Sequence, residues 1–160
     1  LLAGQYQITV TQDKFERVRK VNDKKDLKIF LDVFNKCYQK NDPQNPYGEL
    51  GDYLMISESV WHKHHSTGRV EYFIVYKEND PVAVSTLNNH NEIGYISNVG
   101  SLKSVRGQGF GKIATLYCVR ESRQRGNKIH CLATEEGDYP NEFYKRIGFK
   151  TCFTAAAYIC

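Results

Sequence analysis

Hydrophobic residues recur at helical spacing near the start of the chain. Across residues 26–39 they fall every three or four positions, which predicts an amphipathic helix that buries Leu27, Phe30, Leu31, Phe34 and Tyr38. Residues 41–48 are rich in Asn and Pro and predict a loop, and a second helix is expected over residues 49–65. Residues 15–21 alternate imperfectly and favour a strand, whereas residues 1–10 fit either a strand or an ordered tail.

The middle of the chain follows strand patterns. Residues 70–77 are rich in β-branched and aromatic side chains, and residues 78–81 form a turn signal before a return strand over residues 82–87. Residues 88–91 mark a second turn, which is followed by a third strand over residues 93–102. The pattern therefore predicts an antiparallel meander.

The last third alternates between helix and strand. A helix is expected over residues 112–125, stopped by Gly126, and then a short buried strand over residues 128–134. A short helix over residues 139–147 and a final strand over residues 149–159 complete the chain. Because a strand–helix–strand connection joins parallel strands, the fold class is α+β (mixed α/β), a meander joined to a βαβ unit.

A glycine-rich segment lies between the third predicted strand and the helix that follows it. Gly107, Gly109 and Gly111 stand at every second position, which frees the backbone to turn and to approach a ligand closely. A helix that begins there points unpaired N–H groups and a positive dipole end at an anion, and Arg106 and Lys112 add positive charge. The segment predicts a site for phosphates, most simply a pyrophosphate, although three glycines alone also fit a flexible turn.

Composition sets broad limits on the class of protein. With 160 residues, 41% of them hydrophobic, the chain suits a single domain over residues 1–160, with residues 1–14 as an extension or the remnant of a longer chain. A net charge of +4 is too weak to argue for nucleic acid, and no apolar run approaches the ~20 residues of a membrane span. The five cysteines form no C-x-x-C pair and favour a reduced, cytoplasmic protein over a disulfide framework or a catalytic thiol.

Two short motifs flank one helix and one strand in the second half of the chain. The first is Arg106-Gly107-Gln108-Gly109-Phe110-Gly111, and the second is Tyr144-Lys145-Arg146-Ile147-Gly148-Phe149. Taken together, they resemble the motifs of the GNAT superfamily of acyl-CoA-dependent N-acetyltransferases. The resemblance implies a central, mostly antiparallel twisted sheet flanked by helices, with a βαβ coenzyme A-binding unit. It also implies transfer of an acetyl group from acetyl-CoA, as co-substrate and without a metal, to a primary amine.

The resemblance assigns roles to individual residues. The backbone from Gly107 to Lys112, including Gln108 and Phe110, should cradle the coenzyme A pyrophosphate, and the strand end at Val99, Gly100 and Ser101 should pair with the pantetheine arm. Tyr144 should protonate the departing thiolate. The family's asparagine seven positions before this tyrosine is replaced by Gly137, and Asn141 is the nearby substitute.

The acceptor side of the reaction is left open by the sequence. Glu92, Glu135, Glu136 and His90 are alternative general bases, and each also fits a solvated surface residue. Tyr47, Tyr53 and Trp61 either line an acceptor pocket or belong to the core. The spacing of His62, His64 and His65 does not favour a metal site. The acceptor is expected to be a small-molecule or peptide amine.

Two other kinds of function are retained beside amine acetylation. A non-catalytic acyl-CoA-binding module within a longer protein would carry the same motifs, and a domain that binds nucleic acid through its basic residues is the third reading. The expected partners include no nucleic acid and no membrane, and a homodimer is left open.

Overall fold

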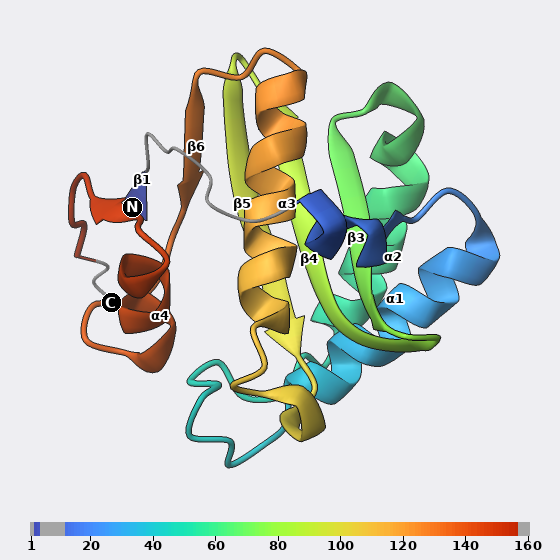
Figure 1. Cartoon of the computed structure of the whole chain (residues 1–160), viewed down its shortest axis with the longest axis horizontal. Coiled ribbons are helices and arrows are strands. Elements are labelled where there is room, and N and C mark those ends of the chain that lie inside the picture. Colours follow the sequence, from blue (N-terminus) through green and yellow to red (C-terminus); the bar gives the residue numbers. More distant parts are fainter. Residues whose placement is uncertain (1, 4–11, 157–160) are drawn as a thin grey trace.

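The computed structural model describes residues 2–3 and 12–156, which form a mixed sheet flanked by helices (Figure 1). The seven strands lie in the order β2-β3-β4-β5-β6-β1-β7. β3 (Val70–Lys77), β4 (Asp80–His90) and β5 (Ile93–Ser101) make the predicted antiparallel meander, and the short β2 (Val18–Lys20) adds to its outer edge. β6 (Ile129–Leu132) runs parallel to β5, which confirms the predicted βαβ unit.

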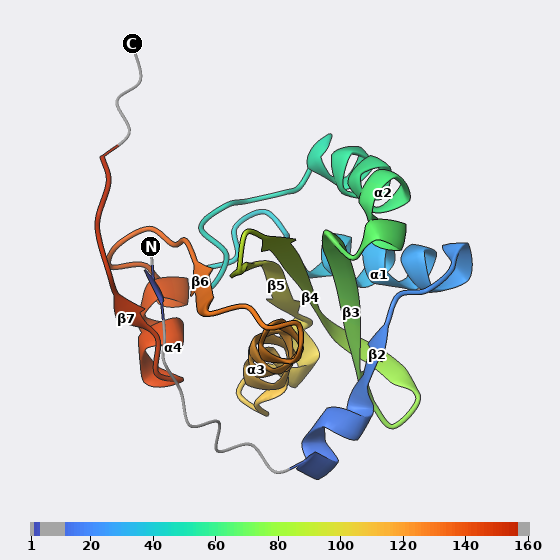
Figure 2. The same ribbon diagram turned by 90° about the horizontal axis from the view of Figure 1, so that it is seen from above.

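Helices cover both faces of the meander (Figure 2). α1 (Lys24–Cys37) and α2 (Tyr53–His64) lie on one face, and α3 (Phe110–Gln124) lies on the other. α4 (Tyr139–Arg146) lies beyond β6, beside the two-residue strands β1 (Leu2–Ala3) and β7 (Lys150–Thr151). The short 3-10 helices are η1 (Gln12–Arg17), η2 (His65–Thr67) and η3 (Lys103–Val105).

The α1 helix follows directly from its sequence pattern. Its start is fixed by Asp23, whose side chain accepts a hydrogen bond from the Asp26 backbone N–H at 2.8 Å. The face that repeats every three or four residues is buried against the sheet, including Leu27, Phe30 and Phe34. Phe30 stacks on Tyr72 of β3 with ring centroids 4.2 Å apart, so α1 is fastened to the centre of the meander.

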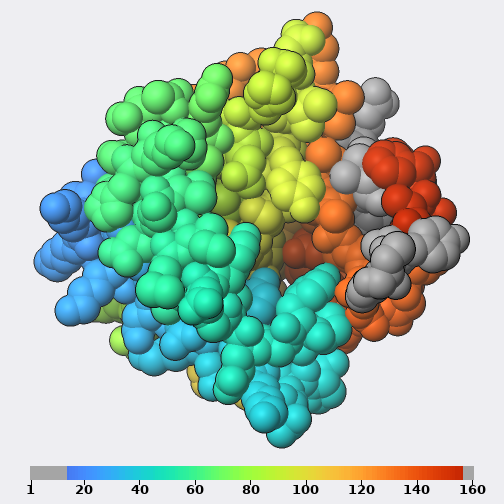
Figure 3. All heavy atoms as spheres, turned by 180° about the vertical axis from the view of Figure 1, so that it is seen from behind, coloured from blue at the N-terminus to red at the C-terminus, as the bar shows by residue number. Residues whose placement is uncertain are grey.

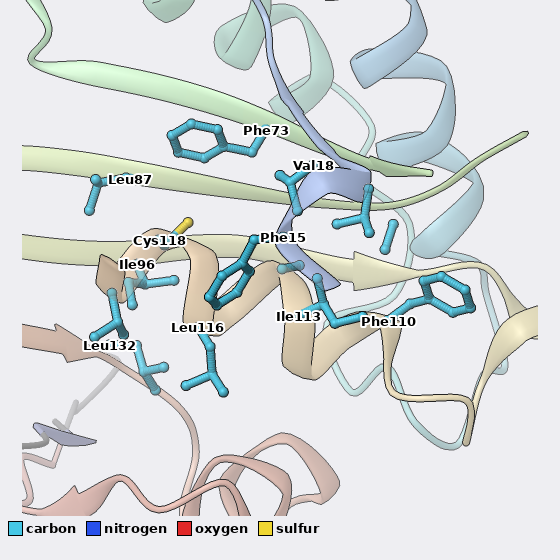
Figure 4. Packing of buried hydrophobic residues seen from close by; sticks show 14 of the residues in the cluster. Phe15, Val18, Phe73, Leu87, Ile96, Phe110, Ile113, Leu116, Cys118 and Leu132 are labelled. Atoms are coloured by element: carbon cyan, nitrogen blue, oxygen red, sulfur yellow. The ribbon is translucent and has the colours of Figure 1, made fainter. Parts of the chain in front are cut away.

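The hydrophobic core on the α3 face joins strands, helix and η1 (Figure 4). Phe73, Leu87 and Ile96 project from successive strands and meet Ile113 and Leu116 of α3, together with other buried side chains (Phe15, Val18, Phe110, Cys118 and Leu132). All of these are less than 9% exposed, so α3 is held firmly along its length. The start of α3 is thereby fixed relative to the end of β5.

A buried carboxylate ties four elements together at the other end of the sheet. The Glu71 side chain of β3 is 1% exposed and pairs with Lys20 of β2 at 2.5 Å and with Arg125 after α3. Asn89 of β4 donates a further hydrogen bond to it at 3.2 Å. Since a buried charge is tolerated only when it is paired and hydrogen-bonded, this network stabilises the edge of the meander.

β5 and β6 separate after a short parallel contact, and this separation creates the site. The two strands pair only from Ile93 to Tyr95 of β5, whereas β5 continues to Ser101. A register shift between β4 and β5 adds a bulge near Asn98, whose φ of 52° lies in the left-handed region that Asn tolerates better than most residues. The outer half of β5 therefore has an edge that no strand covers among the described residues.

Several stretches differ from the expected secondary structure. Residues 49–52 precede α2 instead of opening it, and residues 88–90 extend β4 instead of forming a turn. Residues 15–21 are not a continuous strand: η1 covers Phe15, and only Val18–Lys20 is extended. Phe15 of η1 and Val18 of β2 are both buried, and the change from helix to strand between them interrupts the alternation. The final strand is limited to Lys150–Thr151, and residues 152–156 are exposed and belong to no strand. Its expected end, and most of residues 1–10, lie outside the described residues. Within the described part, no helix is long and apolar enough to cross a membrane.

Candidate functional site

A cavity of about 670 Å³ opens where β5 and β6 separate. Its walls come from the outer half of β5, the segment from Val105 to Lys112, the end of β6, α4, and the loop between α1 and α2. Figure 3 shows the hollow between the loop before α2 (cyan to teal), the strands β4 and β5 (yellow-green) and the β6–α4 segment (orange to red). Segments from across the chain thus converge on one space.

The glycine-rich segment forms one end of this cavity. Gly107 and Gly109 have φ values of 77° and 88°, in the region that favours glycine, and a Cβ at either position would meet no atom within 4 Å. Gly109 is the N-cap of α3 and provides no side-chain cap. The first intrahelical bond described there runs from Ile113 N–H to Gly109 O at 3.0 Å, so the N–H groups of Phe110, Gly111 and Lys112 have no carbonyl partner within α3. Anion binding at this helix start stays a prediction.

Arg106 is held by a carboxylate of the chain itself. Its two terminal nitrogens donate to Asp42 at 2.8 and 2.7 Å, and the Asp42 side chain is 1% exposed. Hydrogen bonding to Arg106 is the main reason why the pKa of Asp42 lies below its ordinary value. Arg106 does line the cavity, but its charge is balanced by Asp42, so its main role is to fasten the α1–α2 loop to the glycine-rich segment.

Gln108 and Lys112 take different directions. The Gln108 side chain accepts a hydrogen bond from Lys77 at 3.2 Å and donates to the Ser104 carbonyl, and it lines a separate surface groove beside η1 rather than the cavity. Lys112 is exposed in the first turn of α3 and lines the cavity. Lys112 therefore brings a positive charge to the cavity, whereas Gln108 does not line it.

The uncovered edge of β5 presents backbone groups to the cavity. Leu102 donates its N–H to Val82 of β4 at 2.9 Å, so by strand alternation the N–H of Ser101 points to the opposite, uncovered edge. The Val99 carbonyl accepts a hydrogen bond from the Tyr38 hydroxyl at 3.3 Å. Gly100 is required for a steric reason, because a Cβ there would lie 2.7 Å from the Cβ of Cys37 in α1. All three predicted residues, Val99 to Ser101, line the cavity.

Tyr144 of α4 lies in the cavity wall. It is only 8% exposed and packs edge-on against Phe143 and Phe149, with ring centroids 5.0 and 5.9 Å away. Burial raises the pKa of its hydroxyl well above 10.0, and the neighbouring tyrosines reinforce this. The hydroxyl is therefore protonated at neutral pH.

Asn141 does not line the cavity itself. Its Nδ2 donates to the Thr134 hydroxyl at 2.9 Å, and Thr134 at the end of β6 lines the cavity in its place. Asn141 Oδ1 is buried without a hydrogen-bond partner. Asn141, the residue suggested in place of Gly137, therefore contacts the cavity lining through its hydrogen bond to Thr134.

Aromatic side chains line a further part of the cavity, which we call its aromatic end. Tyr38, Tyr47, Tyr53 and Tyr95 line it, and Phe34 of α1 packs edge-on against Tyr38 at 5.1 Å. Trp61 is instead part of the core, 2% exposed and stacked on His65. Tyr47 and Tyr53 were anticipated from the sequence; Tyr38 and Asn98 were not, although an asparagine within a strand is itself an unusual signal.

The four candidate general bases lie outside the cavity lining. Glu92 is in the β4–β5 turn and pairs with Lys128 at 2.6 Å, and His90 is exposed at the end of β4. Glu135 and Glu136 are exposed in the β6–α4 loop. Among the described residues, the carboxylate that lines the cavity is Glu49, which sequence reasoning did not single out.

The histidines near α2 are engaged with their own helix. His62 lies 4.0 Å from Glu58, and His65 Nδ1 lies 2.8 Å from the Trp61 carbonyl. Across the described ranges, no group of three or more His, Cys, Asp or Glu side chains is arranged to hold a metal ion.

The chain was compared with known families and structures. Residues 27–149 match the "Acetyltransferase (GNAT) family". Among solved structures, an aminoglycoside antibiotic 6'-N-acetyltransferase from Acinetobacter haemolyticus gives a TM-score of 0.68 at 10% identity, covering 89% of this chain and 97% of that one. Glucosamine-6-phosphate N-acetyltransferase from Arabidopsis thaliana gives 0.64 at 12% identity, with 89% and 96% covered.

A protein from Clostridium acetobutylicum, solved with acetyl-CoA, gives a TM-score of 0.62 at 17% identity and covers 89% of this chain and 94% of that one. At such identities the likeness shows a shared fold. Curated proteins yielded no significant match.

Proposed function

The chain belongs to the GNAT family of acetyltransferases, and on that premise we propose that it transfers an acetyl group from acetyl-CoA to a primary amine by direct attack. One observation carries the proposal: a single cavity joins an anion-ready helix start, an uncovered strand edge, a buried protonated tyrosine and an aromatic pocket. The solved structures that share the fold include N-acetyltransferases and one that contains acetyl-CoA, which supports this class of donor and acceptor.

The residues present fit a coenzyme A thioester. The pyrophosphate would bind the N–H groups at the start of α3, where Gly107 and Gly109 leave the backbone open to close approach. Lys112 would add a positive charge there. The amide groups of the pantetheine arm would pair with the uncovered edge of β5 at Val99 and Ser101, as an added strand does.

The transfer step then needs few protein groups. A neutral amine attacks the thioester carbon, a C–N bond forms, and the carbonyl electrons move to oxygen, where a backbone N–H of the β5 edge would stabilise them. Collapse of this intermediate breaks the C–S bond. The Tyr144 hydroxyl gives its proton to the departing sulfur, and the proton lost by the amine passes to solvent, from which Tyr144 is reprotonated. No covalent enzyme intermediate is required, because one cavity holds both substrates.

The direct test is a thiol-release assay with acetyl-CoA and a broad panel of primary amines. The proposal expects at least one amine to accelerate release of coenzyme A and to be recovered in acetylated form. Tight binding of acetyl-CoA with no turnover across the panel would support the alternative, a non-catalytic acyl-CoA-binding module.

A further inference from the structure

The acceptor end of the cavity is built mainly from tyrosine. Tyr38 follows α1, Tyr47 lies in the α1–α2 loop, Tyr53 begins α2, and Tyr95 comes from β5. Tyr38 and Tyr47 have ring centroids 6.5 Å apart, and the Tyr53 hydroxyl donates to the Asn98 side chain at 3.3 Å. Tyr47 and Tyr53 are 49% and 45% exposed, so their rings are open to a ligand at the rim.

The positive charges in the cavity lining come from few elements. The cations that line it, within the described ranges, are Arg106, Lys112 and Arg146, and these belong to the glycine-rich segment, α3 and the last residue of α4. Arg106 is already neutralised by Asp42. The stretch between Phe34 and Tyr53 and the strand β5 contribute no lysine, arginine or histidine to the lining.

The charge found at the aromatic end is negative. Glu49 lines the cavity between Tyr47 and Tyr53 in the sequence. Glu135 and Asp138, in the facing β6–α4 loop, lie close enough to Tyr47 to raise the pKa of its hydroxyl, although burial contributes more. Two loops that meet at Tyr47 therefore bring carboxylates to the same rim.

These features select for positive charge on the acceptor. The face of an aromatic ring attracts a cation, and a carboxylate at the rim of an open cavity strengthens that attraction. The stretch that carries Tyr38, Tyr47 and Tyr53 and the strand β5 offer no cation to a carboxylate or phosphate on the acceptor, and Glu49 would repel it. The attacking nitrogen must be neutral when it reacts, so the positive charge that is recognised belongs to a second group of the acceptor.

We propose that the acceptor is an amine with a second cationic group and no anionic group, bound through the tyrosine faces and Glu49. This inference rests on the proposed function, because it assumes that the tyrosine-lined end receives the acceptor. It deepens that function by naming a substrate class of which diamines are the simplest members.

The test uses three amines that share a four-carbon chain and differ only at the far end: putrescine, n-butylamine and γ-aminobutyrate. Their affinities for the full chain saturated with coenzyme A are measured by calorimetry, and their turnover with acetyl-CoA is measured separately. The expected order of affinity is putrescine, then n-butylamine, then γ-aminobutyrate. Phenethylamine is added to test recognition of an aromatic body in place of a cation, and it is expected to bind more weakly than putrescine.

A pair of carboxylate variants locates the recognition. In Glu49→Gln the ratio of putrescine to n-butylamine affinity should fall about fivefold, the size expected of a partly exposed charge pair. Glu58→Gln is the matched control, since Glu58 is an exposed carboxylate of α2 that does not line the cavity, and the ratio should stay at its wild-type value.

A pair of ring variants tests the aromatic face. Tyr53→Phe keeps the ring and should retain the wild-type ratio of putrescine to n-butylamine affinity, whereas Tyr53→Leu should lower it about threefold. Equal falls in both variants would assign the effect to the hydroxyl and would count against recognition by the ring.

Binding tests the cation-selective acceptor site, and turnover tests the proposed acetyl transfer. If putrescine binds in the expected order but no amine is acetylated, the cation-selective site stands and the proposed function fails. If n-butylamine, phenethylamine or γ-aminobutyrate binds as tightly as putrescine, the inference is overturned, whether or not acetyl transfer occurs.

Discussion

Burial among aromatic rings sets the protonation state of Tyr144. The pKa of its hydroxyl is raised well above 10.0, first by desolvation and then by neighbouring tyrosines. The phenol therefore keeps its proton through the neutral range, and ionisation of Tyr144 should not limit the rate below about pH 10. Since a thiolate is itself a fair leaving group, the proton helps the reaction without being indispensable.

Replacing Tyr144 with phenylalanine should lower kcat about 100-fold, near the low end of the range for general acid–base catalysis. Affinity for coenzyme A should be retained, because the ring still fills its place between Phe143 and Phe149. Steady-state kinetics and calorimetry on the purified variant provide the check. Tyr117→Phe, which removes a hydroxyl on α3 outside the cavity lining, is the control. An unchanged kcat in Tyr144→Phe would remove this tyrosine from the chemistry.

Substitutions at two glycines distinguish the effect of backbone strain from the loss of contact with the ligand. Gly109 and Gly126 both have positive φ, 88° and 83°, and both face open space, but only Gly109 lines the cavity. Valine at either position should destabilise the fold by about 1–2 kcal/mol, because of the left-handed backbone. Only Gly109→Val should also weaken acetyl-CoA binding, by about tenfold or more, equivalent to ~1.4 kcal/mol. Calorimetry that shows equal acetyl-CoA affinity in the two variants would contradict the assigned pyrophosphate position.

At the scale of elements, the Asp42–Arg106 pair connects the loop before α2 to the segment before α3. Asp42→Asn should lower the free energy of unfolding by about 2 kcal/mol, because it weakens two charge-assisted hydrogen bonds at a buried carboxylate. Asp32→Asn, which alters an exposed pair with Lys36 on α1, should change it by less than about 0.5 kcal/mol. Urea titrations of both variants measure the difference.

The same pair gives a pH dependence of definite sign. Because the pKa of Asp42 is lowered in the folded state, its contribution is present above its ordinary value of 3.8 and is lost as pH falls through the folded value below that. The stability difference between wild type and Asp42→Asn should therefore persist at neutral pH and shrink in acid. A difference that grows on acidification would contradict this account of the pair.

Elements with local signals were predictable from the sequence, and those that depend on distant partners were not. The meander was accessible because turn residues separate strand-like runs, and β3 has the expected bounds, Val70–Lys77. Residues 15–17 were mistaken for part of a strand because Phe15 of η1 and Val18 of β2 are both buried, and the change from helix to strand between them looks like faulty alternation. The Asp42–Arg106 pair joins residues 64 positions apart, in two loops, and no local pattern marks it.

At the scale of the whole molecule, part of the site comes from short sequence motifs and part from residues that are distant in the sequence. The predicted donor residues come from the end of β5 and from the two compact motifs and their neighbours, and all of them except Gln108 and Asn141 line the cavity. The acceptor end is assembled from α1, the α1–α2 loop, α2 and β5, which come together only in the folded chain. The sequence therefore predicts the acyl donor far better than the acceptor. The position of Glu49 in the cavity lining is evident only from the folded structure.

The central claim is that one cavity holds acetyl-CoA and an amine together and transfers the acetyl group directly. Initial rates measured while both substrates are varied, with the acetylated amine quantified by mass spectrometry, test it most directly. The account predicts intersecting double-reciprocal lines and one acetylated amine for each coenzyme A released. Parallel lines, or release of coenzyme A without acetylated amine, would contradict it.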